Sequence, residues 1–146
     1  MKIYVDGSYN PKTKVWGGAA ILMQDDDVVI KEILVSDKDL NGSRQINGEL
    51  ESTIHALRYV LEHLHEIDDK KITIFYDYAG IEKWATGEWT ARKDVAIDYK
   101  KRVQRHLMLL RYEHKIEIIF TKVKAHSGEE FNEKVDRLAK SACNVE

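Results

Sequence analysis

The chain has few of the features that mark secreted or membrane proteins. Its single cysteine, Cys143, excludes an internal disulfide and a cysteine-based metal cluster. No apolar run reaches the length needed to span a membrane, and the residues after Met1 show no signal-peptide pattern. These absences predict a soluble, cytoplasmic protein without a membrane partner.

An overall excess of positive charge is also missing. The formal net charge is −2 and the isoelectric point is near 6.3, which is not typical of a nucleic-acid-binding protein. The distribution of charge along the chain is less even, because basic residues gather between Arg92 and Lys115. This run has two interpretations: a solvated helix face, or a patch that follows a phosphate backbone.

Internal repeats, low-complexity tracts and linkers are absent as well. The 146 residues are 43% apolar and 33% charged, an ordinary composition for a globular domain with a sizeable core. We therefore expect one domain that spans residues 1–146.

The first third of the chain is typical of a three-stranded meander. Residues 2–9, 16–23 and 28–35 are rich in apolar and β-branched side chains and are separated by turn signals. Gly17 and Gly18 indicate a bulge or a close approach of another backbone. The three acids at 25–27 lack the alternate spacing of a calcium loop and are interpreted as a turn.

Helical and strand patterns then alternate. Apolar residues recur at helical spacing from Ile46 to Leu64. The remaining predicted elements are, in chain order, a strand at 72–76, a short helix at 81–86, a helix at 95–112, a strand at 116–123 and a final helix marked by Val135, Leu138, Ala139 and Ala142. Glu129 and Glu130 suit the positive N-terminal end of that helix.

The order of these elements predicts an α/β fold with a five-stranded mixed sheet flanked by helices. Three antiparallel strands come first, and two strands parallel to the first follow through right-handed crossovers. This topology places the end of strand one, the start of the first helix and the ends of the last two strands at one edge of the sheet, where open α/β sheets bind ligands. The residues gathered there are Asp6, Glu49, Asp77, Asp136 and His126.

Four carboxylates at one place repel one another unless cations lie among them. Oxygen ligands without cysteine favour hard ions such as Mg²⁺ or Mn²⁺, and two such ions form a clamp for displacement at a phosphodiester. The alternative gives each acid a separate local role, as a helix-start residue, a strand-end cap or an ion-pair partner. Spacing alone leaves both interpretations open.

Short motifs along nearly the whole chain resemble the type 1 ribonuclease H family. The most specific is a His-x-Gly that stands ten residues before the acid of an Asn-x-x-x-Asp-x-Leu-Ala helix. The motifs are Tyr4-Val5-Asp6-Gly7-Ser8, Gly48-Glu49-Leu50-Glu51, Ile74-Phe75-Tyr76-Asp77, Lys124-Ala125-His126-Ser127-Gly128 and Asn132-Glu133-Lys134-Val135-Asp136-Arg137-Leu138-Ala139.

The resemblance implies a ribonuclease H-like fold and an endonuclease that cuts the RNA strand of RNA–DNA hybrids to 5′-phosphate and 3′-hydroxyl ends. It implies that Asp6 bridges two Mg²⁺ ions, with Mn²⁺ as an alternative metal. Glu49 and Asp77 then complete one metal site and Asp136 the other, while His126 assists proton movement or product release. The expected protein is a monomer whose partner is the hybrid.

The resemblance also implies substrate contacts. Backbone groups near Gly7, Ser8 and Gly48 are expected at the RNA 2′-hydroxyl, and Asn10 and Gln45 are candidates for contacts to sugars or minor-groove edges. Gly48 is interpreted as making room for a nucleic-acid backbone.

The chain departs from the family pattern in two places. Tyr78-Ala79 stand after Asp77 where serine is common, and Gln45-Ile46 replace an amide-rich pair. The basic extension is short, so we expect modest hybrid affinity with strong salt dependence. Trp84 is expected in core packing.

Two other functions remain open from the sequence. The first is a non-catalytic hybrid-binding module of the same fold, although a binding protein has no need to maintain four mutually repelling carboxylates. The second is a DNA-directed nuclease that shares the same sheet.

Overall fold

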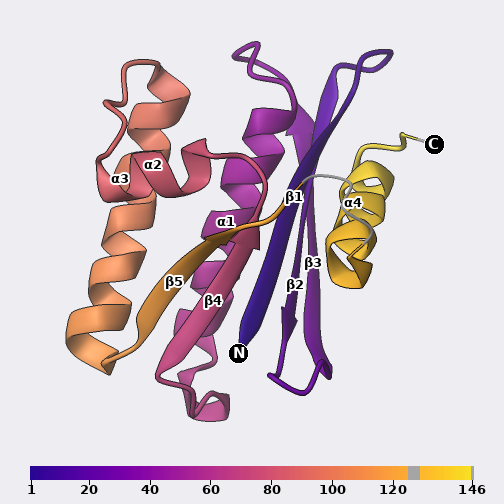
Figure 1. Ribbon diagram of the computed structural model, residues 1–146. Coiled ribbons are helices and arrows are strands. Elements are labelled where there is room, and N and C mark those ends of the chain that lie inside the picture. The colour runs from indigo at the N-terminus through magenta and orange to yellow at the C-terminus, as the bar shows by residue number, and fades with distance from the viewer. Residues whose placement is uncertain (125–128, 146) are drawn as a thin grey trace.

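A computed structural model describes residues 1–124 and 129–145 and shows a sheet with helices on both faces (Figure 1). The strands are β1 (Lys2–Asn10), β2 (Val15–Met23), β3 (Val29–Lys38), β4 (Lys71–Tyr76) and β5 (Glu117–Lys122). The helices are α1 (Gln45–Glu62), α2 (Gly80–Thr86), α3 (Asp94–Met108) and α4 (Glu130–Ala142), with short helical turns at Leu64–Glu66 and Leu109–Glu113. In the described part of the chain, no helix is long and apolar enough to cross a membrane.

The sheet has the strand order β3-β2-β1-β4-β5. Neighbouring strands among β1, β2 and β3 pair antiparallel, whereas β4 pairs parallel with both β1 and β5. The predicted α/β architecture is therefore confirmed, including the two parallel strands that follow the meander.

The core lies on both sides of the central strands. Ile3 and Val5 of β1 face a large apolar cluster shared with α1 and α3, while Tyr4 faces a smaller cluster formed with α4. Figure 1 shows α4 alone on its side of the sheet, with α1, α2 and α3 on the other. Burial on both faces explains why the central strands are apolar almost without interruption.

Glycines allow helices to lie very close to β2. A Cβ atom added to Gly18 would meet the carbonyl oxygen of Gly48 in α1 at 2.5 Å. On the opposite face of the sheet, a Cβ atom added to Gly17 would meet the carbonyl oxygen of Ala139 in α4 at 2.4 Å. The close approach predicted at these two glycines is confirmed, and the register shift of β2 against β3 lies elsewhere, between Leu22 and Met23.

Two helices differ from their predicted bounds. The helix expected at 95–112 ends as an α-helix at Met108 and continues as the wider helical turn Leu109–Glu113. The last helix begins earlier than its apolar pattern suggests, because the Glu129 carboxylate caps it by accepting hydrogen bonds from the backbone N–H groups of Phe131 and Asn132.

Candidate acidic site and surrounding hollows

The parallel register of β1 and β4 brings two acids together. Tyr4 pairs with Phe75, and their rings stack with centroids 4.7 Å apart. Asp6 lies two residues after Tyr4, still within β1, and Asp77 lies two residues after Phe75, directly after β4. The same offset therefore places these two carboxylates side by side at one edge of the sheet.

Glu49 reaches this edge from the second turn of α1. Gly7, next to Asp6, makes its approach possible. A Cβ atom at Gly7 would lie 2.5 Å from the backbone nitrogen of Glu49 and 3.0 Å from its Cγ. Any side chain larger than hydrogen at position 7 would therefore push the helix and its carboxylate away from the sheet.

The three acids form one compact cluster. One carboxylate oxygen from each of Asp6, Glu49 and Asp77 lies within 4.8 Å of the other two. Asp6 and Glu49 are buried, with exposed fractions of 6% and 5%, and Asp77 is half-buried. Burial of this many like charges is costly unless a proton or a cation compensates them.

The pKa values of the two buried acids reflect that cost. Burial raises the pKa of Asp6 to about 7, and the charge of Asp77 adds to the rise. The backbone N–H of Gly7 donates to Asp6 Oδ1 at 2.9 Å and opposes it. Burial raises the pKa of Glu49 well above its usual range, and the charges of Asp6 and Asp77 raise it further.

The donor set fits a divalent cation. Among residues 1–124 and 129–145, no group donates a hydrogen bond to Glu49 Oε2, although this atom is fully buried. A buried carboxylate oxygen without a donor, beside two further carboxylates, is the environment that Mg²⁺ or Mn²⁺ stabilises. Asp6, Glu49 and Asp77 can therefore hold a hard metal ion.

Asp136 lies at the margin of this cluster. It lines a space of about 20 Å³ together with Asp6 and Asp77, and its charge contributes to the raised pKa of Asp6. However, it does not belong to the set of three oxygens within 4.8 Å, and its Oδ2 pairs with Lys140 Nζ at 3.0 Å. The structure thus brings carboxylate oxygens of three of the four predicted acids within 4.8 Å of one another, with the fourth acid alongside them.

Two further residues that were not predicted as site residues line the same small space. Asn132 and Glu133 come from the first turn of α4. Glu133 precedes Asp136 by three residues, a spacing that puts both on one face of a helix. That spacing was available in the sequence and would have identified Glu133.

A shallow hollow of about 600 Å³ adjoins Asp136 and contains three of the predicted substrate-contact residues. Gly7, Ser8 and Gln45 line it together with Arg44 and Asp136. Gln45 is the first residue of α1, and Gly7 and Ser8 belong to β1, so these two elements both line the hollow.

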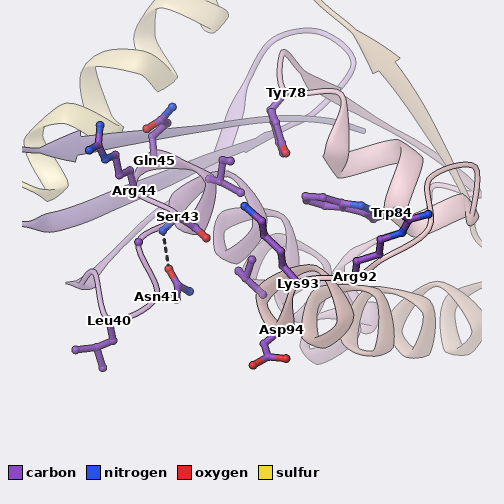
Figure 2. Close-up of a pocket in the computed structure, with 13 residues that line it drawn as sticks. Leu40, Asn41, Ser43, Arg44, Gln45, Tyr78, Trp84, Arg92, Lys93 and Asp94 are labelled. Atoms are coloured by element: carbon purple, nitrogen blue, oxygen red, sulfur yellow. Dashed lines mark hydrogen bonds between the residues drawn. The ribbon is translucent and has the colours of Figure 1, made fainter.

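A second hollow of about 930 Å³ lies on the other side of Arg44 and Gln45. Figure 2 shows these two residues across from Tyr78 and Trp84. Arg92 and Lys93 also line this hollow, which makes it basic and aromatic. Trp84 packs against the core as predicted, whereas Trp89 is 39% exposed and meets the Trp84 ring edge-on.

Arg44 and Gln45, which separate the two hollows, follow a polar loop that is held by hydrogen bonds. The carboxylate of Asp39 accepts hydrogen bonds from the backbone N–H groups of Gly42 and Arg44 and from the side chain of Asn47. Arg44 has a φ of 52° and extends over the ring of Tyr9, with its guanidinium carbon 5.8 Å from the ring centroid. These contacts position the loop before α1 and the Arg44 side chain.

Two of the predicted substrate-contact residues, Asn10 and Gly48, make contacts within the protein. Asn10 is buried, its amide donates to the carbonyls of Cys143 and Asn144, and its oxygen accepts from Lys12 and Thr13. These bonds engage both the amide nitrogen and the oxygen of the side chain, so a substrate contact through this side chain would have to displace them.

Gly48 also needs a different explanation. A Cβ atom at this position would lie 1.9 Å from the carbonyl oxygen of Gly17. The sheet is therefore a neighbour that requires a glycine here, and the expected contact of the Gly48 backbone with the RNA 2′-hydroxyl stays a prediction.

His126 lies outside the described residues, so the structure does not place it.

The basic run between Arg92 and Lys115 is not a single patch. Arg92 and Lys93 line the large hollow, whereas Arg102 is bound to Glu51 and Asp98 by ion pairs. Lys101, Arg105 and Arg111 are exposed along the outer side of α3 and the turn after it.

The chain is similar to several solved ribonucleases of this fold. It matches RNase H1 from the archaeon Halobacterium salinarum with 19% identity and a TM-score of 0.75, covering 98% of this chain and 96% of that one. It matches LC11-RNase H1, solved in complex with an RNA/DNA hybrid, with 15% identity and a TM-score of 0.77 over the same shares of the two chains.

A third solved structure is the N-terminal RNase H domain of Rv2228c from Mycobacterium tuberculosis, with 15% identity, a TM-score of 0.72 and coverage of 98% and 94%. At these identities the likeness establishes the fold. No curated protein matches the sequence. The RNase H family profile, however, matches residues 1–144. The chain therefore belongs to the RNase H family.

Proposed function

We propose that this protein is a metal-dependent endonuclease that hydrolyses the RNA strand of RNA–DNA hybrids, leaving 5′-phosphate and 3′-hydroxyl ends. The observation that carries the proposal is the cluster of Asp6, Glu49 and Asp77, with its buried and unbonded Glu49 oxygen. A protein that only bound nucleic acid would gain stability from a neutral residue at these positions.

The acids have distinct roles in this proposal. Asp6 is central, because it is buried beside Glu49 and Asp77 and also shares the small space with Asp136. Asp6, Glu49 and Asp77 would hold one divalent ion, and Asp136 would help to hold a second beside Asp6. When bound, the two ions supply an activated water and stabilise the leaving oxygen of the phosphodiester.

The protein environment keeps these acids ready for a cation. Without one, burial raises the pKa of Asp6 to about 7 and raises the pKa of Glu49 well above its usual range, because it disfavours their charged forms. Loading the site therefore releases protons. Lys140 holds the Asp136 carboxylate in the meantime, so the uptake of a second ion competes with that ion pair.

The two hollows on either side of Arg44 and Gln45 suit a double-stranded substrate. The hollow with Gly7, Ser8 and Asp136 adjoins the acids and would hold the strand that is cut. The larger hollow with Trp84, Arg92 and Lys93 would hold the second strand through its phosphates. If the protein recognises the hybrid by its shape and by the 2′-hydroxyl groups of the RNA, it should have little preference for base sequence.

His126 retains the role that the resemblance gives it, namely proton movement or product release. We expect His126→Ala to lower turnover while metal binding is preserved. If this variant instead loses metal-induced stabilisation, the residue belongs among the ligands and the proposed role is wrong.

The test is a cleavage assay with end-labelled RNA–DNA hybrid and Mg²⁺, run beside all-DNA and all-RNA duplexes of the same sequence. We expect cleavage confined to the RNA strand of the hybrid and abolished by EDTA. Hybrid binding without cleavage would favour a non-catalytic module. Cleavage of the all-DNA duplex would identify a DNA-directed nuclease.

A further inference from the structure

Three cationic side chains surround the shallow hollow beside Asp136. Lys14 comes from the turn between β1 and β2, Arg44 directly precedes α1, and Lys140 belongs to α4, so three separate segments each bring one positive charge to the same place. Of the described residues that line the hollow, Asp136 alone is acidic. The lining therefore carries an excess of positive charge, although the net charge of the whole chain is −2.

Two of these cations are held in position by one residue. The backbone N–H of Asp39 donates to the carbonyl oxygen of Lys14 at 2.8 Å, and the Asp39 carboxylate accepts from the backbone N–H of Arg44 at 3.3 Å. Lys14 and Arg44 both have a left-handed backbone, with φ of 58° and 52°. This conformation costs free energy outside glycine, and it is common where a segment is shaped to hold a ligand.

Lys14 and Arg44 are exposed and can take an anionic partner. In the part of the chain that the structure describes, neither forms an ion pair with an acid. The Arg44 side chain lies over the ring of Tyr9 in β1, and Figure 2 shows it extending away from Trp84 and the large hollow. Arginine recognises phosphate through its planar set of N–H donors.

Lys140 differs from the other two because it already has a partner. Its Nζ lies 3.0 Å from Asp136 Oδ2, one helical turn away on α4, and both side chains line the hollow. The two side chains have exposed fractions of 41% and 25%, and an ion pair this open to water contributes little free energy. A phosphate in the hollow therefore competes effectively with Asp136 for the ammonium group.

We propose that Lys14, Arg44 and Lys140 bind phosphates of the hybrid strand that lies beside the acids, and that Lys140 does so by exchanging the Asp136 carboxylate for a phosphate oxygen. The inference rests on the proposed function and adds a coupling to it. When Lys140 leaves Asp136, that carboxylate becomes available to a cation beside Asp6. Binding of the hybrid and loading of the second cation then favour each other, because coupling between two ligands is reciprocal.

The phosphate contacts are tested in EDTA, where the hybrid binds without being cut. Fluorescence anisotropy measures the affinity for a labelled hybrid at several salt concentrations. Lys14→Gln combined with Lys140→Gln should lower the slope of log K against log salt concentration by about 2, and Arg44→Gln should lower it by about 1. The matched control is Lys12→Gln combined with Arg137→Gln, which removes the same charge from the same turn and the same helix outside the hollow. The control should change the slope much less.

A double-mutant cycle in EDTA tests the exchange itself. Lys140→Gln should weaken hybrid binding more in an Asp136→Asn background than in the wild type, by up to about fivefold, because the lysine there has no carboxylate to give up. A lysine that stays on Asp136 would instead give an equal or a smaller loss in that background.

Circular dichroism confirms that each variant is folded. A wild type that does not bind the hybrid in EDTA overturns the inference, as do equal slopes for the two double variants or equal losses in the two backgrounds of the cycle. These measurements do not depend on cleavage. A protein that meets all of these expectations but cuts nothing would refute the nuclease activity and leave the phosphate site standing.

Discussion

Asp6 and Asp77 lie at the same level of two neighbouring parallel strands, two residues beyond the stacked pair of Tyr4 and Phe75. The parallel pairing of the two strands thus brings the backbone positions of both acids to neighbouring points at one edge of the sheet. Glu49 adds a third carboxylate from α1.

Asp6→Asn is expected to abolish hybrid cleavage and to leave hybrid binding largely intact. The amide preserves the shape of the side chain but removes the charge that the other acids share through a cation. Cleavage and binding are measured on the same labelled hybrid, the latter by fluorescence anisotropy. A variant that cleaves at the wild-type rate would refute the catalytic assignment.

The stability of the metal-free protein should depend on pH through Asp6. Its pKa rises from 3.8 to about 7 on folding, so the folded state binds the extra proton between these values and stability falls as pH rises through them. The shift corresponds to about 4 kcal/mol, present below pH 4 and lost above pH 7.

Urea unfolding with EDTA at several pH values measures this dependence. The difference between the wild type and Asp6→Asn isolates the contribution of Asp6, since the asparagine does not titrate. We expect the free energy of unfolding of the variant to rise relative to that of the wild type as pH increases from 4 to 7. An equal slope for both proteins would show that the Asp6 carboxyl is not desolvated.

Mg²⁺ should raise the melting temperature of the wild type at pH 8 and should have little effect on Glu49→Gln. The glutamine neutralises the buried oxygen that lacks a donor, so the variant should be at least as stable as the wild type without metal. Glu62→Gln is the matched control on an exposed part of α1 and should respond to Mg²⁺ like the wild type. A full Mg²⁺ response from Glu49→Gln would exclude Glu49 as a ligand.

Gly48→Ala should destabilise the fold by about 2 kcal/mol and reduce cleavage. Its Cβ atom would collide with the backbone of Gly17, and the overpacking penalty of about 1–3 kcal/mol outweighs the gain in helix propensity. Because α1 must shift, Glu49 moves away from the other acids. Glu62→Ala on the same helix should be close to neutral, and chemical unfolding compares the two; equal stability would disprove the tight contact.

Replacing Arg92 and Lys93 together by glutamine should weaken hybrid binding and flatten its dependence on salt. Each phosphate contact that is lost lowers the slope of log K against log salt concentration by about 1, so we expect a change of about 2. Lys101→Gln with Arg105→Gln removes two charges from the outer side of α3 and should have less effect. The reverse ranking would place the second strand of the hybrid along α3 instead of in the large hollow.

The sequence by itself determined the sheet, its strand order and the acids at its edge. Residues 3–5 and 19–23 are apolar without interruption, and such strands are stable only when both faces are covered. The order of strands and helices then predicted a topology in which the first strand, which carries Asp6, lies parallel to the strand that ends just before Asp77. These features depend on local pattern and chain direction, both of which can be read without coordinates.

Only the tertiary structure decided which polar groups are free to act. Asn10 is occupied by the C-terminal backbone, Arg102 by Glu51, and Asp136 in part by Lys140. Gly48 serves the packing of α1 on the sheet. The bonds of Asn10 and Arg102 and the contact of Gly48 join residues far apart in the sequence. They depend on distances of a few tenths of an ångström, which side-chain packing sets and which no pattern of residue types encodes.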